Sequence, residues 1–143
     1  MNQLTSLDVS NNTALTFLGC STNQLTSLDV SKNTQLEWLD HSVNQLTSLD
    51  VSRNNALIVL FCYRNQLTSL DVSNNTELRN LACGENQLTS LDVSNNIALE
   101  QLECEEMPSL HEVCVWEIPF PPEGVQVFTT DSPNVYFTTE CSN

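Results

Sequence analysis

A unit of 21 residues occurs five times between residues 2 and 106, and nine of its positions, NQLTSLDVS, are the same in every copy. The copies begin at Asn2, Asn23, Asn44, Asn65 and Asn86. A fixed period of this length is typical of a solenoid, in which each unit forms one coil and buries its apolar edge only against its neighbours. The repeat therefore predicts a solenoid over residues 1–106. It also directs the search for function to the positions that vary between coils.

Each unit contains two similar apolar patterns, LxxLxVxxN and LxxLxCxxN. In the first unit, one pattern runs from Leu4 to Asn12 and the other from Leu15 to Asn23. The alternation L-x-V or L-x-C has the period of two that a short strand with one buried face requires, and helical spacing does not occur. We expect a mainly β solenoid with few or no helices and two short parallel strands in each coil. Equivalent strands would lie about 4.8 Å apart.

The asparagine that ends each pattern has a structural explanation. At a tight bend, the backbone leaves N–H and C=O groups that strand pairing does not satisfy. An asparagine side chain offers both donors and an acceptor to such groups. We therefore expect two asparagine ladders that bond to the turns and to the neighbouring coil, rather than glycan or ligand sites.

The pattern LxxLxCxxNQLTSLDVSxNT resembles the 21-residue leucine-rich repeat of bacterial surface proteins similar to internalin J, over about three-quarters of the chain. The resemblance implies that the LxxLxCxxN half is a concave strand whose cysteines stack as a ladder of buried thiols. The ladder positions in this chain are Cys20, His41, Cys62, Cys83 and Cys104. The histidine departs from the family pattern. We interpret it as a core residue, because zinc needs ligands that converge tetrahedrally and a ladder offers them in a row.

The repeat ends where Met107 stands in place of the expected asparagine. Residues 125–127 and 135–137 then alternate like two short strands around a turn. We expect residues 107–143 to form a C-terminal β cap. The aromatic residues expected to shield the last coil are Trp116, Phe120, Phe128 and Tyr136.

Two further cysteines, Cys114 and Cys141, lie outside the repeats. We predict a disulfide between them, which would close a loop of about 27 residues and contribute about 3 kcal/mol in chain-entropy models. A disulfide in this position indicates an oxidising, extracytoplasmic setting.

The chain carries a formal net charge of −14, with only four lysine and arginine residues. It has no basic stripe for nucleic acid, and the charge also disfavours an anionic membrane surface. No apolar run approaches the roughly 20 residues of a membrane-spanning helix. The outward aspartates of the first pattern form a row, Asp8, Asp29, Asp50, Asp71 and Asp92. Mutual repulsion in this row is expected to raise some of the aspartate pKa values or to recruit cations, although the carboxylates do not converge as calcium prefers.

The outward residues of the second pattern differ in every coil and include aromatic side chains and an arginine, a composition typical of an interaction hot spot. The candidate partner-binding residues are Phe17, Trp38, Asp40, Phe61, Tyr63, Arg64, Glu85 and Glu103. The resemblance likewise implies a protein ligand on this strand, and the acidic rim favours a partner with a basic surface. The function predicted first is a non-catalytic protein-binding module of a bacterial surface or secreted protein, without a cofactor or a metal.

The alternative function is a structural or self-associating rod in which the repeats set the length. The chain begins within a repeat and without a signal peptide, as a trimmed start would, so its first coil would be uncapped and could form a homodimer. A further explanation of the variable outward residues is neutral sequence drift at positions that the fold does not constrain. Enzymatic activity has no support, because His41 and His111 are the only imidazoles and no nucleophile and base are evident.

Overall fold

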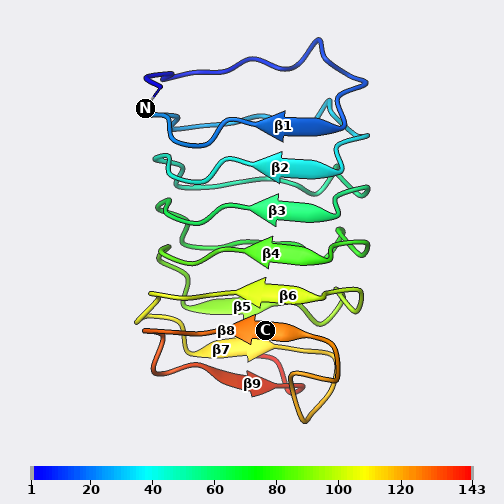
Figure 1. Ribbon diagram of the computed structural model, residues 1–143, viewed down its shortest axis with the longest axis vertical. Helices are drawn as coiled ribbons and strands as arrows, with labels where there is room; N and C mark the ends of the chain where they lie inside the picture. Colours follow the sequence, from blue (N-terminus) through cyan, green and yellow to red (C-terminus); the bar gives the residue numbers. More distant parts are fainter. Residues whose placement is uncertain (1, 143) are drawn as a thin grey trace.

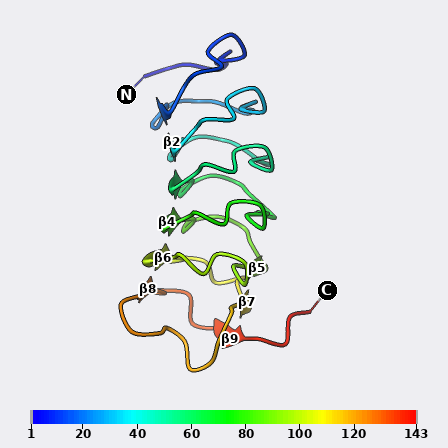
Figure 2. The same ribbon diagram turned by 90° about the vertical axis from the view of Figure 1, so that its right-hand side faces the viewer.

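The computed structural model describes residues 2–142 and shows a parallel β-solenoid, a single stack of coils with the chain ends at opposite ends of the stack (Figure 1). The described residues contain no helix, and every strand is three residues long. One six-stranded sheet contains β1 (Phe17–Gly19), β2 (Trp38–Asp40), β3 (Val59–Phe61), β4 (Asn80–Ala82), β6 (Gln101–Glu103) and β8 (Gln126–Phe128). A three-stranded sheet contains β5 (Ser90–Asp92), β7 (Glu112–Cys114) and β9 (Tyr136–Thr138). Figure 2 shows β5 and β7 on the side of the coils away from β6 and β8.

The strands of the repeats pair in parallel with a shift of one unit. Leu39 of β2 lies between Leu18 of β1 and Leu60 of β3, and the same alignment continues into β4 and β6. The side chains at i and i+2 of a strand point outward when the one between them points inward, so these central leucines all enter the core. Leu39 and Leu60 are completely buried. Burial of each such leucine contributes about 2 kcal/mol, and the core is therefore a column of equivalent contacts.

The parallel solenoid is confirmed, but the second strand forms only near the C-terminal end. In the earlier coils, the LTSLDV segments are not strands, and only an isolated bridge joins Asp71 to Asp92. Asparagine side chains bond neighbouring coils on this side; the carbonyl of Val30, for example, accepts a hydrogen bond from Asn54 Nδ2 at 3.0 Å. Near the C-terminal end, Val93 N donates to the backbone carbonyl of Cys114 in the next coil.

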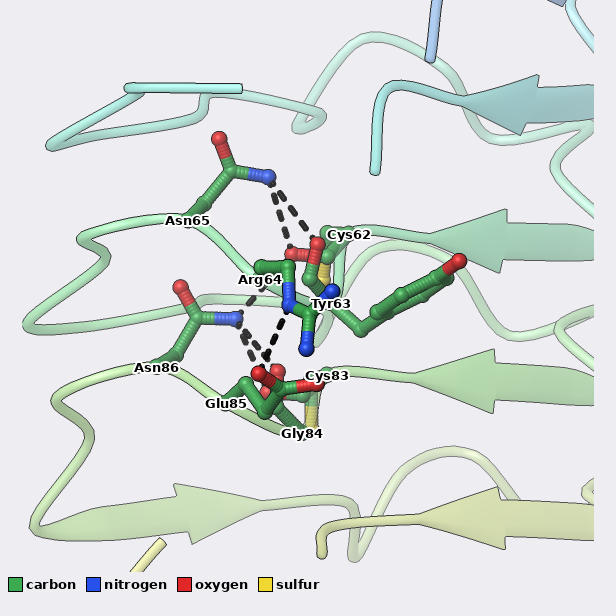
Figure 3. Close-up of polar contacts among 8 residues, drawn as sticks. All are labelled: Cys62, Tyr63, Arg64, Asn65, Cys83, Gly84, Glu85 and Asn86. Atoms are coloured by element: carbon green, nitrogen blue, oxygen red, sulfur yellow. Dashed lines mark hydrogen bonds and ion pairs between the residues drawn. The ribbon is translucent and has the colours of Figure 1, made fainter. Parts of the chain in front are cut away.

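The two asparagine ladders perform the predicted role, with different bonding patterns. In the first, Asn54 Nδ2 donates to two carbonyls of the preceding coil, Val30 O at 3.0 Å and Asn33 O at 2.9 Å. In the second, Asn65 Nδ2 donates to carbonyls in its own coil and in the preceding one, while its Oδ1 accepts the N–H of Leu46 at 3.0 Å. Figure 3 shows Asn65 and Asn86 in this second ladder. Each coil is thereby bonded to the next on both sides of the core.

Residues 107–142 extend both sheets of the solenoid. β7 pairs with β5, β8 with β6, and β9 with β7. Trp116 and Phe120 meet edge to face with ring centroids 5.2 Å apart, and Phe120 also lies 5.0 Å from the ring of Phe137. Phe128 and Tyr136 are 39% and 51% exposed, so the prediction that they shield the last coil is wrong. Both strands begin one residue later than expected, but the alternation is kept: Val127 and Phe137 pack against the core, so Phe128 and Tyr136 lie on the outward face.

The turn at Met107 is satisfied by a residue that the repeat does not predict. Met107 N donates to Ser132 Oγ at 2.9 Å, and Ser132 Oγ donates to the carbonyl of Cys104 at 2.7 Å. Ser132 is 4% exposed. A hydroxyl can accept and donate at once, so this serine from the next turn replaces the missing asparagine.

Candidate functional site

The outward face of the six-stranded sheet carries the side chains that differ between coils. In each strand the first and third residues point away from the core, and the parallel register places them beside their equivalents in the next coil. Nothing among the described residues covers this face with a second layer, as Figure 2 shows for the stack of β2, β4, β6 and β8. The variable residues are therefore available to a partner.

Three aromatic side chains join into one cluster on the first three strands. The rings of Phe17 and Trp38 are stacked, with centroids 4.0 Å apart and planes 4° from parallel. Trp38 then meets Phe61 edge to face at 5.8 Å. A Cβ atom at Gly19 would contact both the Phe17 ring, at 3.5 Å, and the Trp38 ring, at 3.7 Å. Both are ordinary van der Waals distances, and Phe17 is left 58% exposed.

The side chains next to this cluster carry charge. Arg64 Nε donates to Glu85 Oε2 at 2.7 Å across adjacent coils (Figure 3). The hydrogen bond that Arg64 donates to Glu85 and the negative charge of Glu85 raise the pKa of Arg64. Both residues occupy the left-handed backbone position before a ladder asparagine, with φ of 54° and 51°. Tyr63 lies beside them and is 40% exposed.

The other two predicted site residues are engaged locally. Asp40 Oδ1 accepts the N–H of Ser42 at 3.0 Å, so its carboxylate closes a turn in its own coil. Glu103 accepts a hydrogen bond from the side chain of Gln101. Both carboxylates are half-buried and remain on the outward face.

The structure thus divides the eight predicted residues into an aromatic group and a charged group. Tyr63, Glu85 and Glu103 line one hollow of about 200 Å³, which Arg64 borders through its ion pair with Glu85. Three further residues, Gly84, Glu105 and Glu106, complete the lining. They were missing from the predicted site because each looked like an isolated polar or small position. The sequence feature that could have identified them is a glycine at an outward position of one coil, followed by glutamates at the equivalent positions of the next coil.

The five ladder residues are buried in the core and have no access to a ligand. Their exposed fractions are 5% for Cys20 and 0% for the other four, and all four cysteines are free thiols. Burial raises the pKa of Cys20 to about 11 and of Cys62 and Cys104 to about 12. Because the thiolate is the reactive form, these cysteines are inert packing residues.

His41 is the exception within the ladder. Neither ring nitrogen has a hydrogen-bond partner among the described residues, and burial lowers its pKa to about 4. The structure thus places His41 in the core but gives its ring nitrogens no partner within residues 2–142. Its imidazole is neutral at pH 7, and the two unpaired nitrogens make it a costly replacement for a thiol.

Cys114 and Cys141 form a disulfide, with their Cα atoms 5.5 Å apart and a sequence separation of 27. Asp92 lies beside them, and these three residues are the one group of metal-ligating type that converges within residues 2–142. Sulfur in a disulfide is not a thiolate ligand, so the group is not a metal site while the bond is intact.

The aspartate row behaves differently from the expectation of raised pKa values. Each carboxylate accepts the N–H of the serine two residues later at 2.9 Å, as Asp29 does from Ser31. Hydrogen bonds from these serines lower the pKa of the first four members, which are Asp8, Asp29, Asp50 and Asp71. Hydrogen bonding to the charged form outweighs repulsion between exposed carboxylates, which water screens.

No helix that could cross a membrane occurs in the part of the chain that the structure describes.

Comparison with solved structures finds the same fold in two bacterial proteins. Internalin InlF from Listeria monocytogenes superposes with a TM-score of 0.71 and 18% identity, over 94% of this chain and 50% of that one. A leucine-rich repeat protein from Leptospira interrogans gives a TM-score of 0.75 and 21% identity, over 96% and 42%. The functional domain of InlJ from Listeria monocytogenes, which includes a cysteine ladder, gives 23% identity over 94% and 48%, with a TM-score of 0.39. No protein-family model and no curated protein sequence matches the chain.

These similarities define the fold. The chain is a leucine-rich repeat β-solenoid with coils of 21 residues, and it spans about half the length, or less, of the solved chains that it matches.

Proposed function

We propose that this chain is a non-catalytic protein-binding module of a bacterial surface or secreted protein. The observation that carries the proposal is the aromatic cluster of Phe17, Trp38 and Phe61 on an uncovered sheet face. Exposed aromatic side chains that touch one another form an apolar patch, and such patches on soluble proteins mark contact sites. Their rings are already ordered by stacking, so a partner loses little side-chain entropy when it binds them.

Other features of the chain support this assignment. The buried thiols and the neutral, buried His41 offer no nucleophile or base at the surface. The disulfide between Cys114 and Cys141 favours an oxidising location outside the cytoplasm. The acidic net charge of −14 favours a protein with a basic surface over nucleic acid.

The test is a binding screen against host and bacterial surface proteins, performed in parallel with the variant Trp38→Ala/Phe61→Ala/Tyr63→Ala. We expect a partner whose affinity falls at least about tenfold in the variant, because central aromatic anchors commonly contribute more than 1 kcal/mol each. Ile97→Ala is the matched control, since Ile97 is an apolar side chain that is 69% exposed outside this cluster. If the triple variant binds within a factor of two of the native chain, the sheet face is not the binding site.

The alternative proposal is a structural rod whose first coil pairs with a second copy. It is favoured by the identical NQLTSLDVS segments and by Leu4, which is 46% exposed. Sedimentation over a concentration series, with Leu4→Ser as the variant, distinguishes the two. A dimer that the substitution disrupts supports the rod. A monomer at every concentration refutes self-association through the first coil.

A further inference from the structure

The hollow on the outward face arises where one coil has almost no side chains. The fourth coil places only the small residues Ala82 and Gly84 at two outward positions. The equivalent positions are occupied by Phe61 and Tyr63 in the third coil, and by Glu103 and Glu105 in the fifth. A Cβ atom at Gly84 would lie 2.8 Å from the backbone oxygen of Glu105, so the coils approach too closely there for a larger residue. The requirement for glycine therefore creates a depression between two walls.

The two walls have complementary chemistry. Tyr63, 40% exposed, provides an aromatic wall on one side. Glu103, Glu105 and Glu106 provide carboxylates on the other side. Arg64 is already paired with Glu85, and no other ion pair within residues 2–142 reaches the hollow. The three carboxylates thus form no ion pair among residues 2–142, although Glu103 accepts a hydrogen bond from Gln101 and the charge of Glu106 acts on Arg64.

This arrangement fits a lysine or arginine side chain better than a metal ion. Metal ligands must converge on one point, and no group in the described residues that includes these glutamates does so. A long basic side chain instead has an apolar stem for the tyrosine ring and a charged end for the carboxylates. The volume of about 200 Å³ is open to the outward face, next to the aromatic cluster.

We propose that the uncovered sheet face binds a protein segment that inserts a lysine or arginine side chain into the hollow at Gly84 while its apolar residues cover Trp38 and Phe61. The proposal rests on the protein-binding function above and adds the chemistry and orientation of the partner. The apolar part of the segment lies over β2 and β3, and its basic residue points towards β6. Charge complementarity selects this occupant, because the chain has 18 acidic and only four lysine and arginine residues.

The probe is a displayed library of random linear peptides selected on the immobilised native chain. An enriched peptide is then synthesised together with a version in which its basic residue is replaced by glutamine. Affinity is measured for the native chain and for Glu103→Gln/Glu105→Gln, which gives a double-mutant cycle. The control variant Glu37→Gln/Glu77→Gln changes two exposed carboxylates elsewhere and has the same net charge.

We expect selected peptides that combine an aromatic or aliphatic residue with lysine or arginine. Either change alone, in the peptide or in the hollow, should weaken binding about tenfold, and both together should weaken it no further, as for one pair of charges that is partly desolvated. The control variant should bind as the native chain does.

The alternatives give different results. Peptides whose affinity depends on Trp38 and Phe61 but is unchanged for Glu103→Gln/Glu105→Gln would refute the basic subsite. They would leave the protein-binding function intact. A peptide that binds the aromatic triple variant unchanged, or a library with no binder, would refute both. If calcium alone occupies the hollow and displaces the peptide, or if the chain itself associates through Lys32 or Arg53, the occupant is not a partner segment and the proposal fails.

Discussion

The two asparagine ladders differ in one bond, and this difference predicts unequal losses of stability. Asn54 of the first ladder donates two hydrogen bonds, while its Oδ1 has no partner among the described residues. Asn65 of the second ladder donates to His41 O at 3.2 Å and Cys62 O at 3.1 Å, and also accepts the N–H of Leu46. Leu46 is fully buried, and its N–H has no other acceptor in the described chain. Alanine at position 65 would therefore leave a buried donor unpaired.

The magnitudes follow from the count of bonds. Asn54→Ala removes two bonds of about 1 kcal/mol each. The carbonyls of Val30 and Asn33 keep their turn partners, Asn33 N and Leu36 N, so the expected cost is about 2 kcal/mol. Asn65→Ala removes three donated bonds, the longest to Tyr63 O at 3.4 Å, and leaves the N–H of Leu46 unpaired at a cost of about 1–3 kcal/mol, so the expected total is about 4 kcal/mol. Burial predicts the opposite order, because Asn54 is 0% exposed and Asn65 is 8% exposed.

The assay is urea unfolding of both variants and the native chain, followed by circular dichroism. The two positions lie in adjacent central coils, so both substitutions should act on the same cooperative unit, and the slopes with urea concentration should be equal. We expect the free energy of unfolding to fall about 2 kcal/mol further for Asn65→Ala than for Asn54→Ala. Equal losses, or a larger loss at Asn54, would show that the unpaired N–H of Leu46 is not the decisive cost.

Three further predictions concern strain, protonation and the disulfide. Val43 is β-branched and has a φ of 55°, a left-handed backbone conformation that asparagine tolerates better. Val43→Asn should therefore raise the free energy of unfolding by about 1 kcal/mol. A lower urea midpoint for the variant would contradict this prediction. Burial lowers the pKa of His41 from 6.5 to about 4, so the unfolded chain binds a proton at a higher pH than the folded chain. The free energy of unfolding should therefore fall by about 3 kcal/mol as the pH decreases from 6.5 to 4. His41→Cys should lack this loss in urea titrations across the same range, while the aspartates with lowered pKa values lose their contribution only at lower pH. Reduction of the disulfide between Cys114 and Cys141 should destabilise the C-terminal coil by about 3 kcal/mol. The expected signs are faster proteolysis and a change in Trp116 fluorescence. The control variant Cys141→Ser should show no response to reductant.

The sequence predicts the repeating part of the fold because every coil obeys the same local rules. The alternation around Leu39 and its equivalents identifies the inward positions, and the period of 21 residues sets the parallel register. The asparagines were recognisable because tight bends leave backbone groups that need both a donor and an acceptor. The second row of strands was overestimated, since only β5, β7 and β9 form on that side of the coils.

The candidate site was only partly predictable. The sequence places Phe17, Trp38 and Phe61 in adjacent coils, but only the structure shows that the first two rings stack and that the third meets Trp38 edge to face. The hollow at Gly84 depends on small residues in one coil and larger ones in both neighbours, a relation that no single repeat displays.

What the sequence determines by itself is therefore periodic: the solenoid, its register, the inward leucines and the asparagine ladders all follow from one unit copied five times. What the tertiary structure decided is found where the copying stops or where neighbouring coils differ. Ser132 replaces an asparagine from 25 residues beyond Met107, and the C-terminal strands begin one residue later than their pattern suggests. The physical reason is that a repeat encodes contacts between equivalent positions, whereas these features depend on contacts between residues that are not equivalent.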